Sequence, residues 1–234
     1  MGLILCIETA TEVCSVALSG DGNILAVRES AALNVHSSML TLFIDEIIKS
    51  SDLTMDKLDA IAVSMGPGSY TGLRIGVATA KGLCYALGKP LIAIPTLRSM
   101  AEGMKYKLQV TSDKKILFCP MIDARRMEVY SELFDKAGNS VREVRAEIID
   151  VYSFQEFLAD YTVVFAGEGA EKCKPSLAGH PNALFLDGFM ASAVYMADLS
   201  ETKFRQKQFE NLAYFEPFYL KEFVAGKPRV KGLS

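Results

Sequence analysis

Hydrophobic and polar positions in the first hundred residues follow two patterns, short apolar runs and helical repeats. The short runs predict strands at residues 3–7, 15–19, 24–30, 60–65 and 91–94. Asp21, Gly22 and Asn23 tolerate positive φ and predict a hairpin between the second and third strands. Apolar residues three and four apart between 39 and 48 predict an amphipathic helix. This order of elements indicates a mixed sheet with helices on its faces.

The second half of the chain begins after a polar stretch at residues 102–115, which indicates a subdomain boundary. Beyond it, "ILFCPMIDARRMEVYSELF" is similar to the opening "LILCIETATEVCSVALS". Each copy has an apolar strand that ends in a carboxylate, so two related halves would aim Glu8 and Asp123 at a shared cleft. The alternative is that two such strand ends arise by chance. Further along, the pattern predicts a strand at 162–166, a turn at 167–169 and an apolar helix at 189–199.

The glycine-rich stretch "GPGSYTGLRIGVATAKGLCYALG" occupies residues 66–88. It does not match a phosphate loop, because no glycine stands five residues after Gly66, Gly68 or Gly76. It also misses the dinucleotide pattern, which needs glycine where Thr71 stands. Ser69 and Thr71 are therefore interpreted as candidate helix N-caps, and Gly88 as the C-terminal stop.

Small residues recur at four-residue intervals along the helix predicted at 71–87. The stripe consists of Gly68, Gly72, Gly76, Ala80, Cys84 and Gly88. Glycine inside a helix costs about 1 kcal/mol relative to alanine, so the stripe indicates close approach of another backbone. Much of the remaining circumference is apolar, and a sheet can cover only one side. The other side needs either the rest of the chain or a partner, and we expect a partner.

Composition and charge narrow the class of protein. The 234 residues carry a formal net charge of −3, which argues against a free-standing nucleic-acid binder but leaves room for a local basic patch. Five widely spaced cysteines without a CxxC pair indicate buried, reduced thiols of a cytoplasmic protein. The N-terminal residues lack the features of a signal peptide, and no apolar run approaches the roughly 18 residues of a membrane span. We therefore expect a soluble protein without a membrane partner.

Candidate catalytic groups are few. His36 and His180 form neither an HxxxH nor an HExxH pair, so we expect no metal site and no catalytic residue. Glu8 and Asp123 could hold Mg²⁺ or act as acid and base, but no phosphate loop accompanies them. Asp123 can equally cap backbone amides within its own turn.

Five segments together resemble the TsaB family, also called YeaZ. They are "IETAT" (7–11), "GPGSYTGLRIG" (66–76), "PTLRSMA" (95–101), "IDARRMEVY" (122–130) and "EPFYLK" (216–221). The resemblance implies an α/β fold of the actin-like ATPase class (ASKHA, ribonuclease H-like), with two tandem subdomains of mixed sheets flanked by helices. Residues 1–106 would carry the dimerisation helix, and residues 107–234 would end in a flexible basic tail.

The same resemblance implies a non-catalytic scaffold role in tRNA modification. TsaB-like proteins act with the paralogue TsaD and the ATPase TsaE to place threonylcarbamoyl on the adenosine that follows the anticodon, in tRNAs that read codons starting with A. The implied partners are thus a TsaD-like paralogue, a TsaE-like ATPase and, for the isolated chain, a second copy, with tRNA reached indirectly. No tightly bound cofactor is implied. The alternative is a weak ATP- and Mg²⁺-binding ATPase or phosphotransferase of the same fold, and nothing supports the glycoprotease activity of older labels.

The resemblance also implies two sets of site residues. The expected partner interface is Gly68, Ser69, Thr71, Gly72, Arg74, Ile75, Gly76, Thr79 and Ala80. The expected vestigial nucleotide cleft is Glu8, Thr9, Asp123 and Arg125. Glu8 stands where many relatives have Asp, which lowers the expectation of nucleotide binding, and Met127 replaces a common glycine.

Overall fold

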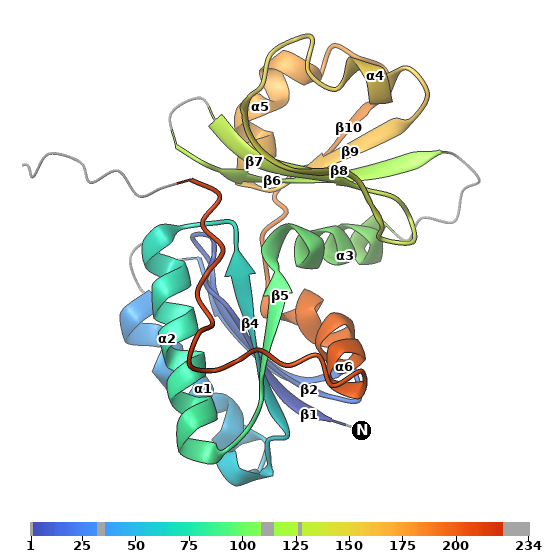
Figure 1. Ribbon diagram of the computed structural model, residues 1–234. Helices are drawn as coiled ribbons and strands as arrows, with labels where there is room; N and C mark the ends of the chain where they lie inside the picture. The colour runs from blue at the N-terminus through green and yellow to red at the C-terminus, as the bar shows by residue number, and fades with distance from the viewer. Residues whose placement is uncertain (1, 32–35, 109–114, 126–127, 222–234) are drawn as a thin grey trace, which may run out of the picture.

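The computed structural model describes residues 2–31, 36–108, 115–125 and 128–221. It consists of two lobes, each built on a five-stranded mixed sheet (Figure 1). The basic tail at 222–234 and Met127 lie outside the described residues. Among the helices described, none has the length and apolar character that crossing a membrane requires.

The first lobe contains the sheet β3-β2-β1-β4-β5. Its strands are β1 (Leu3–Glu8), β2 (Cys14–Gly20), β3 (Asn23–Ser30), β4 (Ala60–Gly66) and β5 (Leu91–Pro95). β1 pairs antiparallel with β2 and parallel with β4, with Ile7 opposite Val16 and Val63. The predicted hairpin is confirmed, because Asp21 and Gly22 adopt φ of 54° and 82°.

Helices cover both faces of the first sheet, because its strands carry apolar side chains on both faces. The helices α1 (His36–Ser50) and α2 (Tyr70–Leu87) share one core with Leu5, Ile7 and Val16, while the short helix η1 (Met55–Lys57) follows α1. The opposite face buries Ile4 and Cys6 against the helix η2 (Ala193–Met196), which continues into α6 (Ala197–Arg205).

The second lobe contains the sheet β10-β9-β6-β7-β8. Its strands are β6 (Ile116–Asp123), β7 (Glu128–Phe134), β8 (Ser140–Ile148), β9 (Thr162–Ala166) and β10 (Ala183–Leu186). One face packs on α4 (Gln155–Leu158) and α5 (Glu168–Leu177), and the other on α3 (Thr96–Leu108), which lies between the two sheets (Figure 1). Each lobe thus has a three-stranded meander followed by two parallel strands, which confirms the internal repeat.

The polar stretch at 102–115, which the sequence predicts as a subdomain boundary, lies between the last strand of the first sheet and the first strand of the second, and its first residues belong to α3, which ends at Leu108. Two local predictions are wrong. Residues 167–169 do not form a simple turn, because Gly167 (φ 99°) precedes the first turn of α5. The helix expected at 189–199 begins only at Ala193, where the Ser192 side chain accepts a bond from the Val194 amide, and it runs to Arg205.

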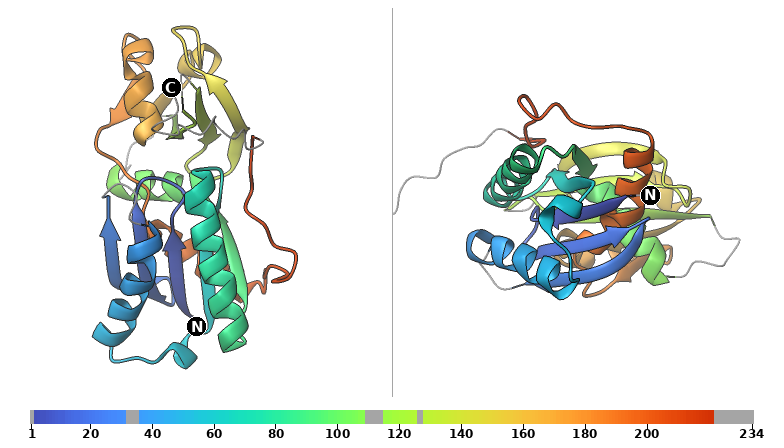
Figure 2. Two further views of the ribbon diagram at one scale, coloured as in Figure 1. Left: turned by 90° about the vertical axis from the view of Figure 1, so that its left-hand side faces the viewer. Right: turned by 90° about the horizontal axis from the view of Figure 1, so that it is seen from below.

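The expected division at residue 106 also needs a correction at the C-terminal end of the chain. Met196 packs into the core of the first lobe, and Phe215 lies in the core between α1, α2 and the sheet. The Glu210 amide donates to the Leu91 carbonyl at 2.9 Å, along the edge strand β5. Residues 193–218 therefore return to the first lobe, as Figure 2 shows, rather than belonging to the second.

Candidate functional site

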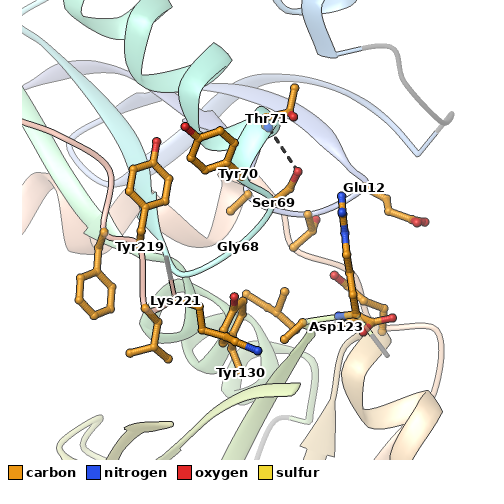
Figure 3. A pocket seen from close by; sticks show the side chains of 18 of the residues that line it. Glu12, Gly68, Ser69, Tyr70, Thr71, Asp123, Tyr130, Tyr219 and Lys221 are labelled. Carbon is orange, nitrogen blue, oxygen red and sulfur yellow. Dashed lines mark hydrogen bonds between the residues drawn. The ribbon is translucent and has the colours of Figure 1, made fainter. Parts of the chain in front are cut away.

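A cleft of about 970 Å³ lies between the two lobes (Figure 3). The first lobe contributes the loop after β1 and the N-terminal turn of α2. The second contributes the end of β6, the start of β7 and Glu168 at the start of α5. The C-terminal residues 218–221 line it as well. The cleft thus forms where the two halves of the internal repeat face each other.

The charge of the cleft lining is mainly negative. Four carboxylates line it, Glu12 from the first lobe and Asp123, Glu128 and Glu168 from the second, with Arg125 and Lys221 as the lining cations. Asp123 pairs with Lys172 at 2.5 Å and accepts the Arg125 amide at 2.8 Å. The latter bond is the turn cap considered for Asp123 on sequence grounds. Burial, together with the negative charges of Glu12 and Asp123, raises the pKa of Glu168 to about 7.

Only half of the residues expected to form the vestigial nucleotide cleft lie in it. Asp123 and Arg125 line the cleft, whereas Glu8 and Thr9 are fully buried behind its wall. The Ala10 amide donates to Glu8 Oε1 at 2.6 Å, and Thr9 Oγ1 donates to the Gly72 carbonyl at 2.8 Å. Both side chains therefore support the loop after β1 instead of facing a ligand.

Several lining residues are not predicted by the sequence. Glu12 stands in a loop without a recognised motif. Glu168 falls in the segment predicted as a turn, although acidic residues are typical of the first turn of a helix. Tyr219 and Lys221 belong to a motif that carried the resemblance, but nothing in their spacing predicts a place in the cleft.

The buried Glu8 should make the stability of the chain depend on pH. Burial raises its pKa from 4.5 to about 7, against the opposing effect of the Ala10 amide. As the pH rises from 4.5 towards 7, the unfolded chain releases this proton while the folded chain keeps it, so the free energy of unfolding falls. Glu8→Gln removes this ionisation, and its free energy of unfolding relative to wild type should rise by about 3 kcal/mol between pH 4 and pH 8. Urea unfolding at both pH values measures this. Equal pH dependence of the two proteins would contradict the assignment.

Of the two predicted N-cap candidates of helix α2, Ser69 is the cap and Thr71 lies within the helix, while Gly88 ends it as predicted. The Ser69 side chain accepts a bond from the Gly72 amide at 3.3 Å, and Gly88 adopts the left-handed conformation with φ 64° at the C-terminus. These caps fix both ends of an 18-residue helix beside the cleft.

The small-residue stripe of α2 faces the chain itself, which corrects the explanation given for it. A Cβ at Gly68 would collide with the Ala10 carbonyl, and a Cβ at Gly72 with the Thr9 carbonyl. A Cβ at Gly76 would collide with Thr9 Oγ1, and Ala80 and Cys84 are buried in the core of the first lobe. The close approach deduced from the stripe is real, but the neighbouring backbone is the loop after β1.

The opposite face of α2 is open. Its exposed residues are Thr71, Arg74, Ala78, Gly82, Tyr85 and Ala86. Ala78, Gly82 and Ala86 form a second small-residue stripe. Apart from the backbone of α2 itself, no described atom lies within 4 Å of a Cβ built on Gly82, and Tyr85 is 84% exposed. Of the nine residues expected at the partner interface, Thr71 and Arg74 lie on this face, with Ile75 and Thr79 half-buried at its margin.

Comparison with known proteins places the chain in a family. A family model described as "TsaD: tRNA N6-adenosine threonylcarbamoyltransferase" matches residues 29–225. A protein from Haemophilus influenzae, named tRNA threonylcarbamoyladenosine biosynthesis protein TsaB, is 30% identical over 237 residues, covering 96% of this chain and 95% of its own. The Escherichia coli protein of the same name is 30% identical and covers 96% of both chains. The chain belongs to the TsaB family. This family takes part in the biosynthesis of threonylcarbamoyladenosine in tRNA.

Solved structures confirm the predicted fold. YeaZ from Pseudomonas aeruginosa superposes with a TM-score of 0.75 at 24% identity, covering 94% of this chain and all of that one. The activator of 2-hydroxyisocaproyl-CoA dehydratase from Clostridium difficile, solved with bound ADPNP, gives a TM-score of 0.50 at 10% identity over 89% of this chain and 98% of its own. The two lobes of the TsaB-family chain therefore have the actin-like ATPase fold.

The cleft does not fit the nucleoside triphosphate and metal that this fold class implies. A polyphosphate would meet four carboxylates and only two lining cations. The glycines that line the cleft, Gly68 and Gly72, leave no open space for a phosphate, because the carbonyls of Ala10 and Thr9 occupy the positions where a Cβ would stand. Within the described part of the chain, no group of three or more His, Cys, Asp or Glu side chains could hold a metal ion.

Proposed function

We propose that this chain is the non-catalytic scaffold subunit that binds a TsaD-like catalytic paralogue through the open face of α2. In this role it supports transfer of threonylcarbamoyl to the adenosine that follows the anticodon. A TsaE-like ATPase is the third component, and tRNA is reached through the complex. In the isolated chain, a second copy takes the same face.

The observation that carries this proposal is the open small-residue stripe around Gly82. A glycine in the middle of an exposed helix face destabilises the helix by about 1 kcal/mol, and outside the backbone of α2 no atom of the described residues lies within 4 Å of a Cβ at Gly82. Ala78 and Ala86 lie one turn before and one turn after Gly82, so the three small residues form a strip without protruding side chains. The exposed ring of Tyr85 lies beside this strip. Such a face allows a second helix to approach closely, and tyrosine is enriched among the residues that anchor interfaces.

The arrangement of possible catalytic groups supports a scaffold over an enzyme. His36 Nε2 lies 3.0 Å from the Thr11 carbonyl in the first lobe, while His180 Nδ1 accepts the Asn182 amide in a turn of the second. The alternative, a weak ATPase or phosphotransferase, would rely on Glu8 and Asp123. Glu8 is buried behind the cleft, and Asp123 is already paired with Lys172.

Reconstitution tests the proposed role. The TsaD-like paralogue, the TsaE-like ATPase, the threonylcarbamoyl donor and tRNA are combined with and without this chain, and modified adenosine is quantified. We expect modification to require this chain together with the paralogue, and we expect none from this chain alone. Modification without this chain, or by this chain without the paralogue, would refute the scaffold role.

Calorimetric titration of the isolated chain with millimolar ATP and Mg²⁺ tests the alternative. We expect no binding heat, because the acidic lining opposes a polyphosphate. A saturable heat that is lost in the Asp123→Asn variant would establish the nucleotide-binding alternative instead.

A further inference from the structure

The C-terminal segment at residues 215–221, called the strap below, is anchored to the first lobe at its start. The Phe215 side chain is buried in the core between α1 and α2, and Lys81 Nζ donates to the Phe215 carbonyl at 2.8 Å. The Phe218 amide donates to the Met65 carbonyl at 2.7 Å, at the end of β4. These contacts hold the first half of the strap against the first lobe.

The second half of the strap crosses to the other lobe. The Tyr219 ring packs on the Tyr70 ring, with centroids 5.0 Å apart, at the first residue of α2. Two residues on, Lys221 forms an ion pair with Glu128 at the start of β7, in the second lobe. Tyr219 and Lys221 both line the cleft, and Figures 1 and 2 show the strap passing from the first lobe towards the second. The strap therefore joins the lobes across the edge of the cleft.

The charges that line the cleft explain why the ion pair between Lys221 and Glu128 should matter for the position of the two lobes. Glu12 of the first lobe and Asp123, Glu128 and Glu168 of the second line the cleft together, with Arg125 and Lys221 as the cations, and the charge of Glu12 helps to raise the pKa of Glu168. The carboxylates outnumber the cations in this lining, so the remaining repulsion across the cleft favours separation of the lobes. Lys172 compensates Asp123 from within the second lobe, whereas Lys221 carries a positive charge from the first lobe to the second.

We propose that the strap is a latch that holds the two lobes together and closes one side of the cleft. When Lys221 is paired with Glu128 the lobes stay closed, and when this contact is released the residues after Phe218 lift and the lobes separate. A molecule that enters on this side must displace Tyr219 and Lys221, while Phe215 keeps the strap attached. The latch is a property of the isolated chain and does not rest on the proposed scaffold role.

Spin labels on the two lobes test the latch. Lys57→Cys in η1 and Glu156→Cys in α4 place exposed labels on the first and second lobes, and the five native cysteines are buried. Pulsed dipolar spectroscopy then gives the distance distribution between the lobes. In this background, Lys221→Glu should broaden the distribution and shift it to longer distances. The combined exchange Lys221→Glu with Glu128→Lys should restore it, because the ion pair is rebuilt in reverse.

A matched control and a second readout separate the latch from a general effect of charge. Lys174→Glu reverses a lysine whose ion pair with Asp187, at 2.6 Å, lies entirely within the second lobe, and it should leave the distribution unchanged. Hydrogen exchange of the Phe218 amide should accelerate about fivefold in Lys221→Glu, the range of an exposed ion pair, and not in Lys174→Glu. A wild-type distribution and exchange rate in Lys221→Glu would overturn the proposal, as would failure of the charge exchange to restore them.

Discussion

Replacing Gly72 with leucine is expected to lower the free energy of unfolding by about 3 kcal/mol, among the larger effects of a single substitution. The Cβ alone would collide with the carbonyl oxygen of Thr9, and backbone cannot move aside as a flexible side chain can. Urea unfolding of wild type and variant measures the loss. For a chain of this length the midpoint of thermal unfolding should fall by roughly 10 °C.

Gly82→Leu in the same helix is the matched control. No described atom meets a Cβ at this position, and leucine favours the helix over glycine, so stability should stay equal or rise by up to about 1 kcal/mol. Equal losses in the two variants would show that α2 is covered on both faces, contrary to the structure.

Replacing Gly82 with arginine is expected to weaken association with the TsaD-like paralogue by at least about 30-fold, the effect of losing one interface hot spot. A long charged side chain on the strip formed by Ala78, Gly82 and Ala86 would prevent close packing of a partner helix and would bury an unpaired charge in the interface. The isolated variant should be as stable as wild type or up to about 1 kcal/mol more stable, because no described atom outside α2 meets a Cβ at this position and arginine favours the helix over glycine. Titration of the paralogue, with binding followed by surface plasmon resonance or calorimetry, measures the affinity.

Gly179→Arg provides the control for this binding measurement. Gly179 is also exposed, and no described atom lies within 4 Å of a Cβ at this position, but it follows α5 in the second lobe. Its affinity should equal that of wild type. If both arginine variants bind equally well, the open face of α2 is not the contact surface.

Periodicity predicted most of the first lobe because its strands and helices carry strong local signals. The spacing of Leu40, Phe43, Ile44 and Ile47 alone requires a helix with one buried face. Helix α3 has a similar spacing in Leu97, Met100, Ala101 and Met104, so this helix too is predictable from the sequence, although the pattern analysis above did not include it.

The candidate site was less predictable because contacts between distant segments decide it. A stripe of small residues shows that some backbone comes close to α2, but spacing cannot tell whether it belongs to the loop at Thr9 or to another molecule. The burial of Glu8 depends on how that same loop folds. Lys221 pairs with a glutamate 93 residues away, and no local pattern predicts such a pair.

Oxidative footprinting of Tyr85 tests most directly whether the outer face of α2 is the docking surface. Tyr85 is 84% exposed on this face, and Tyr152, 73% exposed in the second lobe, serves as the internal reference. Hydroxyl radicals are applied to the complex with the TsaD-like paralogue and to the chain alone, which is diluted until it is monomeric because a second copy would cover the same face. Oxidation is quantified by mass spectrometry. We predict that complex formation protects Tyr85 and leaves Tyr152 unchanged. A complex in which Tyr85 is oxidised as fast as in the free chain would contradict the assignment.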